Sequence, residues 1–164
     1  FDTSDHIRNR VRRYKSHGIA VEGTILLGLD GQTEDDIRRL VDFLLEIELD
    51  LAEFTILTPF PHTRTFQDFH REGRIISYDW NDYTADKVVF KPDKISPEKL
   101  QDLYTYAWDT FYKEEPQSYK MFKLLRSVSM REKADGTYRG RRRELVTTRF
   151  GGEEKMKLGE QTDD

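Results

Sequence analysis

Residues 19–29 read IAVEGTILLGL and residues 51–58 read LAEFTILT, two runs in which strand-forming residues are nearly unbroken. Such runs are typical of strands buried on both faces, as in parallel sheets. Between them, Thr33 is placed to cap a helix with apolar residues at helical spacing, namely Ile37, Leu40, Val41, Leu44 and Leu45. The order strand, helix, strand predicts a βαβ unit with two parallel neighbouring strands.

Helical patterns flank this unit on both sides. The chain before it predicts an amphipathic helix over residues 4–17 that ends at Gly18. The chain after it predicts a short helix at 63–71, an irregular extended stretch at 74–92, a helix that starts at Ser96-Pro97 and carries apolar residues to Phe111, and a helix at about 116–130. We therefore expect an α/β fold with a mostly helical C-terminal cap.

Alternation along each strand separates an apolar face from a polar one. The apolar face carries Val21, Gly23, Ile25, Leu27 and Leu29 in the first strand and Ala52, Phe54, Ile56 and Thr58 in the second. The polar face carries Glu22, Thr24, Leu26 and Gly28 in the first and Glu53, Thr55, Leu57 and Pro59 in the second. We expect helices to cover the apolar face and the polar face to point into a barrel or cleft. Glu22 and Glu53 would otherwise lie in water at the rim, or pair with basic residues of further strands.

Two strands with one crossover helix leave both sheet edges unpaired and one face bare. The sequence predicts no further strand of this type, so the missing strands are expected upstream of Phe1 or in another chain. We therefore expect an incomplete piece of a larger α/β enzyme that is inactive alone.

Composition limits the chemistry of the chain. Its 164 residues are 36% hydrophobic and 35% charged, and they include no cysteine. A disulfide framework, a thiolate metal site and a cysteine nucleophile are therefore excluded. No stretch approaches the roughly 18 apolar residues of a membrane span, and a cytoplasmic location is expected.

Residues 117–150 are locally basic, with ten Lys or Arg against three acidic residues. Arg139, Arg141, Arg142 and Arg143 lie beside Tyr138, and arginine clusters with aromatic rings are typical of nucleic-acid contacts. A nucleic-acid-binding module through residues 131–149 is therefore one alternative function, although such runs are commonly solvated termini. A plain interaction domain that pairs its strand edges with another subunit is a second alternative.

A larger resemblance covers about residues 5–113. The runs GIAVEGTILLGLDGQTEDD, LDLAEFTILTPFPHTRTF, GRIISYDWNDY, VVFKP and SPEKLQDLYTYAWDTFY occur in this order. Together they resemble the C-terminal part of radical S-adenosylmethionine (SAM) enzymes, of the kind that carries an N-terminal cobalamin-binding domain. By this resemblance, residues 1–62 are the C-terminal portion of a barrel, 63–130 a helical cap, and 131–164 a basic and then polar tail that we expect to be mobile.

The resemblance implies a partial (β/α)6 barrel in which this chain supplies the last two parallel strands. It implies SAM and a 4Fe–4S cluster as cofactors of the intact parent and leaves the use of cobalamin open. The positions that match the adenine-contacting strands are Thr24, Leu26, Gly28, Leu57, Thr58 and Pro59. No catalytic residue, metal ligand or bound cofactor is expected in this chain alone. Its expected partners are the rest of the parent chain and an unidentified small-molecule substrate.

Two departures from the family pattern stand out. The cluster-binding CxxxCxxC motif is absent, as the lack of cysteine requires. The usual PFPGT turn reads PFPHT, with His62 in place of glycine. His62 could be an ordinary surface residue or a functional one at the mouth of the barrel, and the sequence leaves both open.

Overall fold

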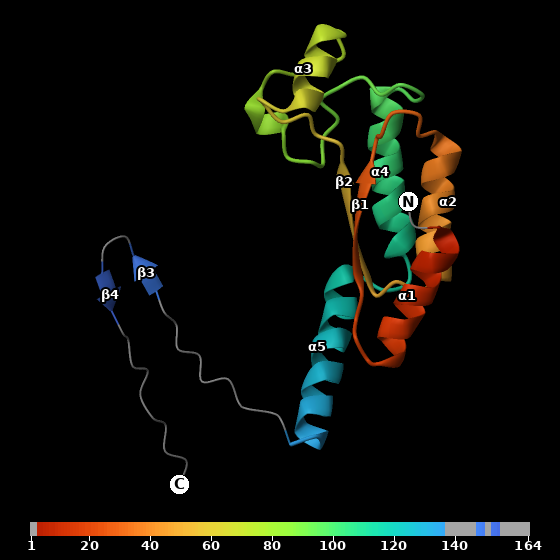
Figure 1. Ribbon diagram of the computed structural model, residues 1–164, viewed down its shortest axis with the longest axis vertical. Coiled ribbons are helices and arrows are strands. Elements are labelled where there is room, and N and C mark those ends of the chain that lie inside the picture. The colour runs from red at the N-terminus through yellow and green to blue at the C-terminus, as the bar shows by residue number, and fades with distance from the viewer. Residues whose placement is uncertain (1–2, 137–146, 150–151, 155–164) are drawn as a thin grey trace. The chain divides into compact units, whose positions relative to one another are not determined.

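The computed structural model describes residues 3–136, 147–149 and 152–154 (Figure 1). The chain divides into two compact units, residues 1–125 and 126–164. The first unit contains α1 (Ser4–Ser16), β1 (Glu22–Leu27), α2 (Glu34–Glu46), β2 (Leu51–Ile56), α3 (Arg64–Arg71), the 3-10 helix η1 (Trp80–Asp82), α4 (Pro97–Phe111) and the start of α5 (Gln117–Ala134). The second contains the rest of α5 and the antiparallel pair β3 (Thr147–Arg149) and β4 (Gly152–Glu154).

β1 and β2 pair in parallel with α2 as the crossover, so the predicted βαβ unit is confirmed. The register places Glu22 opposite Leu51 and Leu27 opposite Ile56. Both strands are shorter than predicted. β1 starts late because residues 19–21 form a connection, in which the Val21 N–H donates to Asp50 Oδ2 at 2.9 Å. It ends early because Gly28 turns the chain with a φ of 87°.

The helix starts follow local side-chain chemistry. Thr33 accepts a hydrogen bond from the Asp36 N–H while Asp36 accepts from the Thr33 N–H, a reciprocal cap that fixes the start of α2. Ser96 accepts from the Lys99 N–H and is followed by Pro97 in the first turn of α4. Both predicted starts are confirmed.

Helices α2 and α4 lie on the same side of the two strands (Figure 1). The core between them includes Leu27, Ile37, Phe54, Leu100 and Leu103, all nearly inaccessible to solvent. α4, which the sequence analysis assigned to the C-terminal cap, packs on β2 and α2 and covers the apolar face of the sheet.

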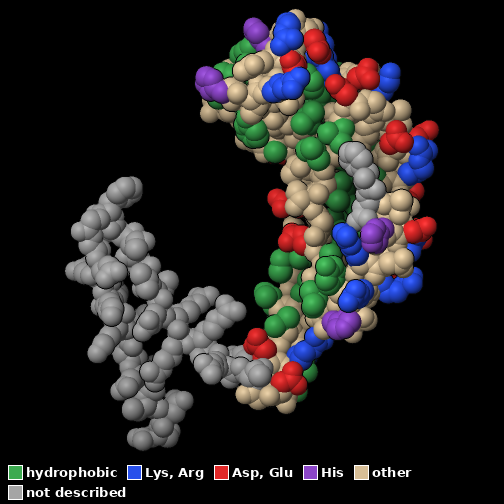
Figure 2. Space-filling model, in the orientation of Figure 1, with side chains coloured by type: hydrophobic (Ala, Val, Ile, Leu, Met, Phe, Trp, Pro, Cys, Tyr) green, Lys and Arg blue, Asp and Glu red, His purple; other side chains and the backbone are tan. Residues whose placement is uncertain are grey.

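In the part of the chain that the structure describes, the opposite face of the sheet is open. Glu22, Thr24 and Glu53 are exposed, and Leu26 keeps 41% of its side-chain surface in solvent. Figure 2 shows acidic side chains at the surface on the side of the strands away from α2 and α4. The predicted assignment of the two faces is therefore confirmed.

Residues 64–92 form an excursion beyond the ends of the strands. It contains α3, η1 and an isolated antiparallel bridge between Ile75 and Phe90. The rings of Phe69 and Phe90 stack with centroids 5.1 Å apart and join the excursion to the core. The predicted helix at 63–71 is confirmed, with Thr63 as its cap.

The C-terminal region differs from prediction in two ways. α5 continues to Ala134, and the short pair β3–β4 lies within residues that were expected to be a tail without regular structure. The expectation of a tail rested on the charged and polar composition of this region. It gave too little weight to the β-branched residues Thr147 and Thr148, which favour strands. The arginine cluster at 139–143 and most of the tail expected to be mobile lie outside the described residues. In the described part of the chain, no helix combines the length and apolarity that a membrane crossing requires.

Two phenylalanines provide a matched test of this core. Phe54 is 1% exposed and packs edge-on against Trp108 and Phe111, whereas Phe60 is 50% exposed. We expect Phe54→Ala to lower the free energy of unfolding by about 3–5 kcal/mol, because it leaves a cavity in the core. Phe60→Ala should cost less than about 1 kcal/mol. Urea denaturation followed by circular dichroism measures both, and equal losses would contradict the assigned core.

Candidate functional site at the strand ends

The six residues predicted to contact adenine differ in their accessibility. Thr24 and Leu26 are exposed, Leu57 and Thr58 are half-buried, and Gly28 and Pro59 are buried. The Leu57 N–H donates to the Leu27 carbonyl at 2.8 Å, which keeps the segments that follow β1 and β2 paired at the carboxyl end of the sheet. Leu26, Gly28 and residues 57–59 therefore lie at the same end. Thr24 lies opposite Glu53 in the middle of the strand, so the structure separates it from the rest.

Gly28 has a packing role that the sequence does not reveal. A Cβ atom there would lie 2.7 Å from Leu100 Cδ2 and 3.3 Å from Phe90 Cζ. Its N–H donates to the side-chain oxygen of Gln32 at 2.8 Å. Only glycine lets β1 turn this close to α4, so Gly28 can offer a ligand backbone groups alone.

A cavity of about 350 Å³ lies between the strand ends and α3. It is lined by Leu29, Asp30, Leu57, Thr65, Asp68, Phe69 and Glu72. Leu57 is the one predicted residue among them. Three carboxylates face this cavity, which makes it less apolar than a slot for a neutral purine.

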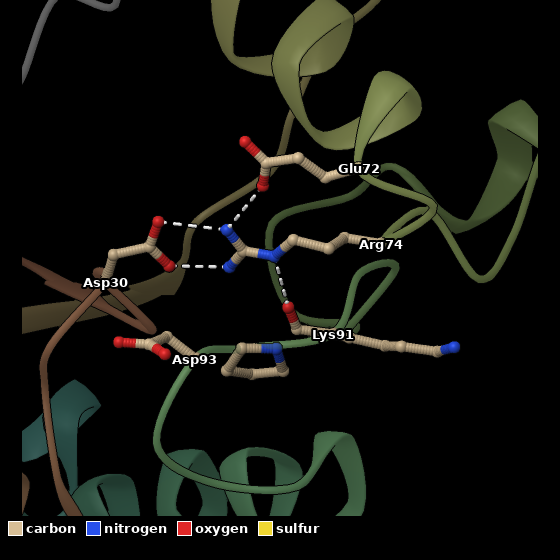
Figure 3. A pocket seen from close by; sticks show the side chains of 6 residues that line it. Asp30, Glu72, Arg74, Lys91 and Asp93 are labelled. Carbon is tan, nitrogen blue, oxygen red and sulfur yellow. Dashed lines mark hydrogen bonds and ion pairs between the residues drawn. The ribbon is translucent and has the colours of Figure 1, made fainter.

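A second cavity, of about 410 Å³, surrounds the side chain of Arg74. Figure 3 shows Arg74 and Asp30 pointing toward one another, one from the segment after α3 and the other from the β1–α2 loop. Arg74 Nη1 and Nη2 donate to the two carboxylate oxygens of Asp30 at 2.9 and 2.5 Å. Nη1 also donates to Glu72 at 3.3 Å, and Nε donates to the Lys91 carbonyl at 2.8 Å. The guanidinium lies 3.9 Å from the centre of the Phe69 ring.

This arrangement uses nearly all the hydrogen-bonding capacity of Arg74. A guanidinium has five N–H donors, and four hydrogen bonds to protein acceptors engage it here. The hydrogen bond from Arg74 lowers the pKa of Asp30 below its usual value, while burial opposes this and the charge of Arg74 adds to it. Arg74 is therefore a clamp that ties the excursion to the β1–α2 loop, and it has little capacity left for an incoming anion.

His62 adopts a backbone conformation that favours glycine. Its φ is 66°, in the left-handed region, and its side chain is exposed. The turn thus has the backbone shape that glycine takes readily, although the residue is histidine. A functional role for His62 remains a prediction.

No family model matches the chain. Among curated proteins, it is 29% identical over 112 residues to the bacteriochlorophyllide d C-12(1)-methyltransferase of Chlorobaculum tepidum, covering 64% of this chain and 24% of that protein. It is 26% identical over 102 residues to an uncharacterized methyltransferase of Pyrococcus horikoshii, covering 62% and 22%. It is 23% identical over 105 residues to the anaerobic magnesium-protoporphyrin IX monomethyl ester cyclase of Cereibacter sphaeroides, covering 64% and 17%.

The chain is related to B12-binding radical SAM methyltransferases and cyclases. The family predicted from the sequence is thereby confirmed. The chain spans about a quarter or less of the length of these relatives. The similarity therefore does not assign the activity of a whole radical SAM enzyme to this chain.

The two cofactors of radical SAM enzymes fit this chain differently. A 4Fe–4S cluster needs thiolate ligands, and the chain has no cysteine, so its residues do not fit the cluster. Within residues 3–136, no group of three His, Asp or Glu side chains is placed to hold a metal ion. SAM needs an apolar surface and backbone donors and acceptors for its adenine. Leu26 and Leu57 offer apolar surface at the strand ends, and the Thr58 N–H is the one backbone donor of residues 57–59 left for a ligand, because the Leu57 N–H donates to Leu27 and Pro59 has none. The six predicted residues do not together line a cavity.

Substitutions at two glycines distinguish the cost of steric crowding from the cost of backbone strain. Gly28 and Gly31 both have a positive φ, of 87° and 83°, but a Cβ at Gly31 would meet nothing within 4 Å. We expect Gly28→Ala to lower the free energy of unfolding by about 1–3 kcal/mol more than Gly31→Ala, because it also forces a methyl group against Leu100. Urea denaturation of both variants measures the difference. Equal losses would mean that Leu100 moves aside freely.

The clamp predicts a pH-dependent contribution to stability. Asp30 has a lowered pKa in the folded chain, so its contribution is present above the ordinary value near 4 and is lost as the pH falls below it. About half of the Asp30 side chain is exposed, and solvent screening limits the effect of Asp30→Asn to about 1 kcal/mol at pH 7. Asp42, exposed on α2 and without an ion pair in the described part of the chain, is the control.

Denaturation at a series of pH values checks this prediction. The gap between the native chain and Asp30→Asn should close between about pH 5 and about pH 2. Asp42→Asn should stay within about 0.5 kcal/mol of the native chain at every pH. A gap for Asp30→Asn that persists at the lowest pH would contradict the role of the carboxylate.

Proposed function

We propose that this chain is the C-terminal portion of a cobalamin-type radical SAM enzyme, and that β1 and β2 are the last two strands of its partial (β/α)6 barrel. The observation that carries this proposal is the one-sided cover of the sheet. Within the described residues, helices pack on one face only, while the polar face and the outer edge of β1 remain open. In the intact enzyme, which we place in the cytoplasm, the missing strands belong to the remainder of the parent chain.

The edge of β1 has the backbone groups that another strand needs. The carbonyls of Val21 and Leu27 accept hydrogen bonds from β2, so alternation turns the backbone groups of Glu22, Thr24 and Leu26 away from β2. Within the described residues the sheet has no third strand on this side. An unpaired edge of this kind favours the addition of a neighbouring strand.

The open face has the character of a barrel interior. Glu22 and Glu53 stand exposed on it, with Leu26 nearer the carboxyl end. Exposed carboxylates on a strand face are suited to pairing with cations from further strands, and ligands of (β/α) barrels bind at the carboxyl ends. In the parent we expect a Lys or Arg from another strand between the two carboxylates.

The role of this chain toward SAM would be to support the adenine. Leu26 and Leu57 would provide apolar contact and Thr58 a hydroxyl group, while the buried Gly28 and Pro59 would shape the strand ends behind them and Thr24 would lie farther along β1. A 4Fe–4S cluster in the parent would have to be held by cysteines outside this chain, where it would supply reducing chemistry. The names of two relatives favour methyl transfer as the reaction. The B12-binding character of the relatives favours cobalamin as a further cofactor of the parent.

Two leucines test the proposed adenine surface in the full-length parent protein. Leu26 on β1 is 41% exposed, and Leu45 on α2 is 40% exposed. Because a carboxylate buried against adenine is unfavourable, Leu26→Asp should raise the dissociation constant of SAM by about tenfold or more. Leu45→Asp should leave it within about twofold.

Isothermal titration under anaerobic conditions measures both affinities. Circular dichroism checks that both variants fold. Equal affinities of Leu26→Asp and Leu45→Asp would contradict the placement of β1 beside SAM. A parent protein that binds no SAM after reconstitution of its cluster would overturn the assignment as a whole.

A further inference from the structure

The start of α5 places two lysines in opposite surroundings. The Pro116 carbonyl accepts hydrogen bonds from the N–H groups of Tyr119 and Lys120 at 2.9 and 3.0 Å, which begins the helix. Lys120 and Lys123 are three positions apart, so they lie near one another on the helix surface. No side chain described in α5 is fully buried, so partly exposed side chains make the contacts that hold its start beside α4.

The amine of Lys120 lies over two aromatic rings. Its Nζ atom is 4.4 Å from the centre of the Phe111 ring and 5.6 Å from the centre of the Tyr112 ring. The side chain is half-buried, and within residues 3–136 no carboxylate lies within ion-pair distance of Nζ. Aromatic rings attract an ammonium group, but they hold its protons less firmly than a carboxylate does.

The two rings under Lys120 are anchored to the core. Phe111 is 3% exposed, and its ring meets that of Tyr112 edge-on at 4.9 Å. The Tyr112 hydroxyl donates to the Ala52 carbonyl at 2.7 Å and accepts from the Ala52 N–H at 3.0 Å. Its ring also stacks on Trp108 with centroids 5.5 Å apart. Because α4 and β2 fix both rings, they form a lasting shield between the amine and water.

Lys123 has the opposite environment. Its Nζ atom donates to the two carboxylate oxygens of Glu115 at 2.6 and 2.9 Å, and half of its side chain is exposed. The hydrogen bond with Glu115 raises the pKa of Lys123, burial opposes this, and the charges of Glu115 and Tyr119 add to it. Lys123 therefore stays protonated, and a protonated amine is not a nucleophile.

The charges around Lys120 leave burial as the main influence on it. Burial lowers the pKa of Lys120. The carboxylates of Glu115 and Asp50 oppose this, and the positive charges of Lys123 and Lys15 reinforce it. The neutral, nucleophilic form of Lys120 is therefore present at a lower pH than for an ordinary lysine.

We propose that Lys120 is a modification site for small acyl phosphates, and that its acylation loosens the start of α5. This goes beyond the proposed function and does not depend on it, because every group that forms the site lies in this chain. A small donor can reach a half-buried amine directly. The positive charge of Lys123 nearby favours the approach of an anionic phosphate.

The transfer needs no further reactant. The neutral Nζ atom attacks the carbonyl carbon of the acyl phosphate, and a C–N bond forms. The C–O bond to phosphate breaks, and phosphate leaves with the electron pair. One proton passes from Nζ to water, so the product is a neutral amide.

Acylation removes the attraction between α5 and the end of α4. The amide has no positive charge to hold over the rings of Phe111 and Tyr112. The ion pair between Lys123 and Glu115 does not replace this contact, because Glu115 lies in the connection after α4 and not on α4 itself.

Reaction of the 164-residue chain with acetyl phosphate at about pH 8 tests the site. Peptide mass mapping over time gives the acetylation rates of Lys120 and Lys123. We expect Lys120 to react about threefold faster or more, because more of its amine is neutral. Exposure alone predicts the reverse order, since Lys123 is the more exposed of the two.

The same reaction in urea is the control. Unfolding removes the rings from Lys120 and the carboxylate from Lys123, so the two rates should then agree within about twofold. Glu115→Gln should narrow the ratio in the folded chain by speeding the reaction of Lys123. Equal rates in the folded native chain would overturn the proposal, and so would a preference for Lys120 that persists in urea.

Hydrogen exchange tests the effect of acylation on α5. Lys120→Gln resembles the acylated side chain, whereas Lys120→Arg keeps a positive charge over the rings. The amides of residues 121–125 should exchange about two- to fivefold faster in Lys120→Gln than in Lys120→Arg, the factor expected for the loss of a cation–π contact. Equal exchange in the two variants would overturn the proposed loosening of α5.

Discussion

The packing of Phe54 against α4 is the contact on which the arrangement depends. Phe54 meets Trp108 and Phe111 edge-on, and α2 fills the same layer through Ile37 and Val41. Because α2 and α4 cover one side, the apolar side chains of both strands are buried on that side alone. The exposure of the carboxylates on the other face follows from this one-sided cover. If the second face were buried as well, the sheet would have no exposed face for a ligand to contact.

The local pattern of the sequence predicted the central unit well. Two nearly apolar runs and a capped amphipathic helix between them are sufficient for a βαβ unit, and the reciprocal cap of Thr33 and Asp36 is a short-range interaction. The face assignment succeeded for the same reason, because alternation is a property of the strand itself. The limits of β1 were missed because Asp50 and Gly28, which set them, act through tertiary contacts and backbone conformation.

The candidate site was harder to predict because its contacts join distant parts of the chain. Arg74 meets Asp30 across 44 positions and Tyr112 meets Ala52 across 60. Neither arginine nor tyrosine stands out from its neighbours in the sequence, and no spacing rule links such pairs. Family resemblance placed residues on the strand ends but could not separate Leu26, which is accessible, from Gly28, which packs under Leu100. The strand pair at 147–154 was missed because polar residues can form strands when a neighbour pairs with them.

The Arg74–Asp30 clamp has a consequence for the order in which the chain assembles. The clamp joins two residues 44 positions apart, so its formation restricts a long loop and lowers the conformational entropy of the chain. We therefore expect it to form after β1 and α2 have fixed the position of Asp30. Contacts between distant residues form late in folding for this reason. The excursion that carries Arg74 is also tied to the core by the stacked rings of Phe69 and Phe90 and by the hydrogen bond from the Ile56 N–H to the Ala85 carbonyl, so its local opening requires the loss of all these contacts. Local opening there would uncover the carboxyl ends of the strands while the βαβ core stays folded.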